Sequence, residues 1–135
     1  MSNSKRIRLS LRLWGEEINH ELITNTLGLK PSHCYERGYV KILSSGKKTI
    51  PKELGIWVYE KNVETTLEHE LDSLLLSLAD RKLKSIEGIQ IAILDIYLGL
   101  SDEDSSLTDS YECRIDNASL LRLGNLGIDV RITVS

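Results

Sequence analysis

Two cysteines and three histidines are the residues of this chain whose side chains could most readily act as nucleophiles or metal ligands. His33 and Cys34 are adjacent in a predicted strand, where successive side chains point to opposite faces, so joint ligation of a metal by the two is unfavourable. Cys34 and Cys113, both in predicted strands, are interpreted first as small buried apolar residues. We therefore predict no catalytic residue and no metal site, and we expect that the protein is not an enzyme.

The acidic, serine-rich segment Ser101–Asp109 is the second feature with possible chemistry. Its spacing of Asp102, Asp104 and Ser106 could suggest a calcium loop, but the central glycine and the terminal bidentate glutamate of such a loop are missing. The chain also lacks the glycine-rich motifs that hold nucleotides and the serine elbow of hydrolases. No cofactor is predicted.

Composition and charge exclude several classes of protein. With 135 residues the chain is expected to form a single domain, residues 1–135, and its 41% hydrophobic and 27% charged residues are ordinary for a globular protein. The net charge of −3 argues against a nucleic-acid partner, and no apolar run is long enough for a membrane span. An alternating start and two cysteines favour a cytoplasmic location.

The segment Thr65–Ile86 has the clearest helical pattern, because five leucines fall on one stripe: Leu67, Leu71, Leu74, Leu75 and Leu78. A second helix is predicted at Glu16–Leu27, ended by Gly28, and a short third one after Asp116 or Asn117. Apolar alternation or continuity predicts the strands Ile7–Leu13, His33–Leu43, Leu54–Glu60, Gly88–Leu100, Tyr111–Asp116 and Ile128–Val134, with a polar loop at Ser44–Lys52.

Arginines at positions 6, 8 and 12 of the first strand could form an anion site, but we interpret them as a solvated face whose arginines meet acids on neighbouring strands. The order of elements predicts an α+β fold. Its first part matches a ferredoxin-like βαββαβ core, extended by a C-terminal βαβ, with a largely antiparallel sheet and helices on one face.

The laid-out pattern resembles the family catalogued as domain of unknown function 4279. The pieces that carry the resemblance are Glu16–Pro31, the Arg37–Gly38 pair, Leu54–Trp57, Leu67–Leu75 and Asn117–Val134. The helix start at Gly15–Glu17 departs from it, since a proline is expected there. The resemblance implies a fold and a bacterial, cytoplasmic setting, and it supplies no active site; some small domains of this type look like immunity proteins that neutralise toxins.

Three functions are weighed for this chain. The first is a non-enzymatic protein-binding module, in particular an immunity protein whose acidic side chains at Asp102, Glu103, Asp104 and Asp109 capture a basic toxin domain. The second is a small-molecule-sensing regulatory domain, with a pocket formed by Arg37, Tyr39, Trp57 and Tyr59. The third is an enzyme that uses Cys34 or Cys113. The sequence leaves the oligomeric state open.

Overall fold

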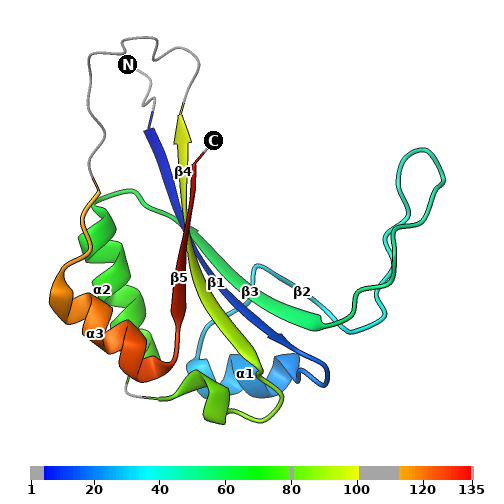
Figure 1. Ribbon diagram of the computed structural model, residues 1–135, viewed down its shortest axis with the longest axis horizontal. Helices are drawn as coiled ribbons and strands as arrows, with labels where there is room; N and C mark the ends of the chain where they lie inside the picture. Colours follow the sequence, from blue (N-terminus) through cyan, green and yellow to red (C-terminus); the bar gives the residue numbers. More distant parts are fainter. Residues whose placement is uncertain (1–4, 80, 101–112, 135) are drawn as a thin grey trace.

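The structure is a computed structural model that describes residues 5–79, 81–100 and 113–134. Its elements follow one another as β1 (Lys5–Gly15), α1 (His20–Leu27), β2 (His33–Tyr35), β3 (Gly55–Asn62), α2 (Leu67–Leu78), the 3-10 turn η1 (Leu83–Ser85), β4 (Ile91–Leu100), α3 (Asn117–Leu126) and β5 (Asp129–Val134). Figure 1 shows the helices gathered beside and below one twisted sheet.

The five strands form a single sheet in the order β2-β3-β1-β4-β5. Neighbours are antiparallel, except that β5 runs parallel to β4. Strand β1 lies in the middle and pairs along its length with β3 on one side and β4 on the other, so that Leu11 faces both Tyr59 and Leu94. The fold is therefore α+β, with an open and mostly antiparallel sheet.

The core lies between one face of this sheet and the three helices. The sheet contributes alternate residues of β1, which are Leu9, Leu11 and Leu13, together with Trp57 of β3. Each helix adds buried apolar side chains. Burial of one such leucine contributes about 1.5–3 kcal/mol to folding. The helices therefore cover the face that the sequence pattern marks as apolar.

Helix α2 carries the predicted leucine stripe, and all five leucines are buried, but the predicted range Thr65–Ile86 is too long. The helix starts after Thr66, whose side chain accepts a hydrogen bond from the backbone N–H of His69 (3.2 Å), and it ends at Leu78. The next positions on the stripe would be Arg81 and Lys82, so a longer helix would turn charges toward the core.

Strand β4 begins at Ile91 and not at Gly88, and three further elements differ from the sequence prediction. Helix α1 begins at His20 and not at Glu16, because the side chain of Asn19 caps it by accepting a hydrogen bond from the backbone N–H of Leu22 (3.0 Å). The helix ends before Gly28, as predicted. The predicted strand His33–Leu43 pairs with β3 for three residues before the chain leaves the sheet. Residues 113–116 of the predicted strand Tyr111–Asp116 are not a strand, and the rest of it lies outside the described residues.

Candidate functional site

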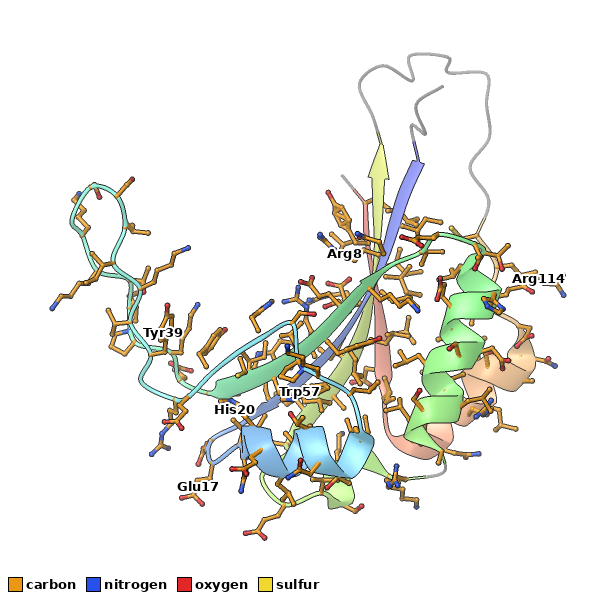
Figure 2. The ribbon with its side chains drawn as sticks, turned by 180° about the vertical axis from the view of Figure 1, so that it is seen from behind. Arg8, Glu17, His20, Tyr39, Trp57 and Arg114 are labelled. Carbon is orange, nitrogen blue, oxygen red and sulfur yellow. The ribbon has the colours of Figure 1, made fainter. Side chains whose placement is uncertain are left out.

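The sheet face opposite the helices, here called the open face, has no helix over it in the described part of the chain. It carries the side chains that alternate with the core positions: Arg8, Ser10, Arg12, Trp14, Ile56, Val58, Glu60, Ile91, Ile93, Asp95, Tyr97, Arg131 and Thr133. Figure 2 shows Arg8 on the side of the sheet away from α2. Although no helix lies over this face, Ser10, Ile56 and Val58 on it are buried, so what it presents to solvent is mainly its charged and aromatic side chains.

Two arginines on the open face share one acid on the adjacent strand as their ion-pair partner. The carboxylate of Glu60 lies 3.5 Å from Arg8 and 3.9 Å from Arg12, and the ring of His33 is also 3.9 Å away. The Arg8 guanidinium stacks over the ring of Tyr97, 4.8 Å from its centroid. The interpretation of Arg8 and Arg12 as a charge-paired face is confirmed, while the side chain of residue 6 lies outside the described residues.

A second polar cluster on the open face ties β5 to β4. Asp95 is 8% exposed, and its two carboxylate oxygens accept hydrogen bonds from Arg131 (2.9 Å) and from the hydroxyl of Thr133 (3.1 Å). A charge this well shielded from water is stable when it is paired and hydrogen-bonded in this way. Asp95 therefore has a structural role that accounts for its place in an otherwise apolar strand.

Beyond β2 the chain forms a projecting hairpin of irregular backbone, residues 36–53, here called the arm (Figure 1). Backbone hydrogen bonds hold it: the N–H of Leu43 donates to Lys47 (2.8 Å), that of Thr49 to Lys41 (2.9 Å), and Ile42 forms a bridge with Lys48. Gly46, at φ +86°, closes the turn. The segment Ser44–Lys52, which the sequence predicts as a polar loop, contains no helix or strand, and these bonds join it to residues 36–43 as one hairpin.

The base of the arm is anchored on the sheet. The rings of Tyr35 and Tyr39 stack with centroids 5.2 Å apart, and the ammonium of Lys52 lies 5.6 Å from the Tyr35 ring centroid. Arg37 reaches Glu16 in the loop after β1, with 3.8 Å between the charged atoms. These contacts limit how far the arm can move relative to β2 and β3.

The arm combines exposed apolar side chains with a net positive charge, whereas the rest of the chain is net acidic. Four large apolar residues of the arm are exposed: Tyr39 at 46%, Ile42 at 66%, Leu43 at 43% and Ile50 at 86%. The arm carries five basic residues against two acidic ones, whereas the remaining chain carries twelve against eighteen. Apolar side chains on a preformed hairpin, ringed by lysines, have the character of a protein-docking element.

Among the hollows of the described residues, Arg37 and Tyr59 of the predicted small-molecule pocket line two different ones, and neither hollow is lined by Tyr39 or Trp57. Trp57 is fully buried beneath the sheet, where its indole N–H donates to Thr24 Oγ1 (3.0 Å), and Tyr39 lies on the arm (Figure 2). Arg37 is at the base of the arm, while Tyr59 lines a hollow of about 30 Å³ on the helix side. That hollow has room for about one water molecule.

The ion pair of Lys61 with Glu70 borders this small hollow. Lys61 Nζ lies 3.1 Å from Glu70 Oε1, and the Glu70 side chain is 7% exposed. The hydrogen bond from Lys61 lowers the pKa of Glu70 below its usual value, although burial acts in the opposite direction; the same bond raises the pKa of Lys61. The pair fastens α2 to the end of β3.

The thiols and imidazoles do not converge in the described structure. Cys34 and Cys113 are both exposed free thiols, so the prediction that they are buried is wrong. Cys34 lies in β2, an edge strand of three residues, which explains its exposure. His20 contacts the carbonyl of Tyr35 (3.2 Å), and His69 is exposed on α2. Among the residues described, no three histidine, cysteine or acidic side chains gather as metal ligands.

A wide hollow of about 620 Å³ lies between the start of α1 and the base of the arm. Glu16, Glu17, Glu21 and Glu36 make its lining acidic, and His20 and Arg37 also border it (Figure 2 labels Glu17 and His20).

The acidic residues predicted from the sequence to bind a partner lie outside the described residues; they are Asp102, Glu103, Asp104 and Asp109.

Sequence reasoning missed the arm, although a signal for it was present. Two short runs of apolar and basic residues, 39–43 and 47–50, flank the tripeptide Ser44–Gly46. A glycine-containing connection of this length is typical of a hairpin with an αL residue in its turn. The sequence prediction assigns the first run to a strand and the second to a polar loop, so it does not join the two into one hairpin.

The chain belongs to the family described as domain of unknown function DUF4279, whose model matches residues 5–135. No curated protein and no solved structure matches the chain. None of the helices in the described residues is long and apolar enough to cross a membrane.

Proposed function

We propose that this chain is a non-enzymatic protein-binding module, and specifically a bacterial, cytoplasmic immunity protein that neutralises a toxin by direct binding. The observation that carries the proposal is the arm, an ordered hairpin that exposes Ile42 and Ile50 at 66% and 86%. Exposed apolar side chains held in place by backbone hydrogen bonds are costly in water unless a partner covers them.

Burial of the two isoleucines in a complex would each contribute about 1.5–3 kcal/mol. Because the arm is already hydrogen-bonded and anchored at its base, little conformational entropy is lost when it binds. Lysines around it favour an acidic area on the partner. The acidic residues Asp102, Glu103, Asp104 and Asp109 would meet a basic area of the same partner and speed its capture.

The finer fold belongs to the same proposal. We propose that β1, α1, β2, β3, α2 and β4 form a ferredoxin-like unit and that α3 and β5 extend it. The strand order β2-β3-β1-β4, antiparallel throughout, and the burial of α1 and α2 side chains in one core support this. An independently determined structure in which β1 is not central would remove it.

Co-expression with the product of the adjacent gene tests the function. We expect the neighbouring product to arrest growth when expressed alone, growth to be restored by this chain, and the two to purify as a stoichiometric complex. A neighbouring product that is harmless and forms no complex would count decisively against the immunity function.

A matched pair of variants tests the role of the arm. Replacement of Ile42 and Ile50 by serine should abolish the growth rescue without lowering the melting temperature, since both side chains are exposed. Leu76→Ser removes an apolar side chain that is 67% exposed on α2 and should leave the rescue intact. Full rescue by the double arm variant would show that the arm is not the docking element.

A further inference from the structure

Within the described residues, strand β5 is an edge of the sheet with no strand on its outer side. It is the last strand in the order and pairs with β4 on one side, and all six of its residues are exposed. The other edge strand, β2, is three residues long and leads into the arm. A long edge presents unpaired backbone N–H and C=O groups, which another strand can satisfy.

The charged residues of β5, Asp129 and Arg131, both point to the open face, so its helix side lacks the usual protection against such pairing. Val130, Ile132 and Val134 point to the helix side and are 36%, 58% and 59% exposed. The strand contains no lysine and no proline. Its basic residue, Arg131, points to the open face, where Asp95 already holds it. In the part of the chain that the structure describes, the strand therefore combines an edge without a neighbouring strand with a row of exposed apolar residues.

The residue pattern of β5 is compatible with pairing to a second copy of itself. The apolar positions are symmetric about Ile132, with a valine two residues before it and another two residues after it. A two-fold axis through an antiparallel pair requires this self-complementarity. A pair centred on Ile132 places Val130 opposite Val134 of the second copy, and Ile132 opposite Ile132 of the second copy.

Charge also favours this register. In the pair centred on Ile132, Arg131 lies opposite Thr133 of the second copy, whose hydroxyl is bonded to Asp95. A pair centred on Arg131 would place two guanidinium groups directly opposite each other, which is destabilising. We propose that the protein forms a two-fold dimer by antiparallel pairing of β5 with β5 about Ile132, which joins the two sheets into one and leaves both arms free.

Sedimentation equilibrium of the full chain tests the dimer. The wild type should dimerise, and Ile132→Lys should weaken the association at least tenfold, because two ammonium groups would meet at the axis. Leu76→Lys, at a comparably exposed apolar position on α2, should associate like the wild type, and circular dichroism should show all three folded. The proposal would be overturned if the wild type were monomeric at both ends of a 100-fold range of protein concentration. It would also be overturned if Ile132→Lys dimerised as tightly as the wild type.

Disulfide cross-linking tests the register in a background with Cys34 and Cys113 replaced by serine. Opposite residues in an antiparallel pair have Cα atoms about 4.5–5.5 Å apart, so Ile132→Cys should cross-link to its own copy under mild oxidation. Val130→Cys alone should not, since the two copies of residue 130 would lie about 13 Å apart, but it should cross-link to Val134→Cys in a mixture. Efficient self-cross-linking of Val130→Cys with none at Ile132→Cys would refute the register.

Discussion

Replacement of Gly15 by alanine should destabilise the protein strongly, because this glycine lies in close backbone contact with the loop before β4. Gly15 is buried at the end of β1, and a Cβ atom added there would overlap the carbonyl oxygen of Gly88. The loop cannot easily withdraw. The backbone N–H of Gln90 donates to the carbonyl of Trp14 (2.8 Å), and the Gln90 side chain accepts the N–H of Glu16 (2.6 Å).

The magnitude follows from these contacts. Overpacking against atoms that cannot rotate away costs about 1–3 kcal/mol or more, and each hydrogen bond that the displaced loop loses adds about 0.5–1.5 kcal/mol. We therefore expect Gly15→Ala to lose about 3 kcal/mol or more. At about 3–4 °C per kcal/mol for a chain of this size, the melting temperature should fall by roughly 10 °C.

Gly124→Ala is the matched control for this substitution. Gly124 lies in α3, is exposed, and has no heavy atom within 4 Å of an added Cβ. Alanine there should stabilise the protein by about 0.5–1 kcal/mol through helix propensity. Urea and thermal unfolding followed by circular dichroism would measure both variants. The steric reasoning would be refuted if the free energy of unfolding of Gly15→Ala lay within about 0.5 kcal/mol of the wild-type value, because ordinary surface substitutions have effects of that size.

Three further outcomes are expected. Trp57→Phe should lower the free energy of unfolding in urea by about 2 kcal/mol, because it removes the hydrogen bond to Thr24 and leaves a void in the core. Trp14→Phe on the open face is the control, and an equally small loss for both variants would contradict this. Glu70→Gln should lower the melting temperature at pH 7. Folding lowers the pKa of Glu70, so the carboxylate's contribution to stability is present above its unfolded pKa of about 4.3 and is lost as the pH falls through the folded pKa. The melting temperatures of the wild type and the variant should therefore converge in acid. A difference that persists there would point to a steric cause. Both thiols, being exposed, should react with a thiol reagent in the native protein, and protection of either until urea is added would show that it is covered.

Part of the open face was foreseeable from local pattern, and part was not. Alternation of arginines with leucines in β1 predicted a charged face paired with acids, and Glu60 is that acid for Arg8 and Arg12. The identity of the acid depends on register, which is set by the pairing of β1 with β3. The partners of Asp95 could not be found in this way, because Arg131 and Thr133 come from a strand more than thirty residues further along the chain.

The sequence by itself determined the type and order of the main helices and strands, because periods of 3.6 and 2 in apolar residues are local properties of the chain. It also determined the leucine stripe of α2 and the glycine end of α1. Tertiary structure decided which strands became edges, and with them the exposure of Cys34 and of the apolar row on β5. It also decided that residues 36–53 leave the sheet as the arm and that their apolar side chains stay exposed. Whether an apolar side chain is covered depends on which distant segments of the chain pack against it, and a local pattern does not contain that information.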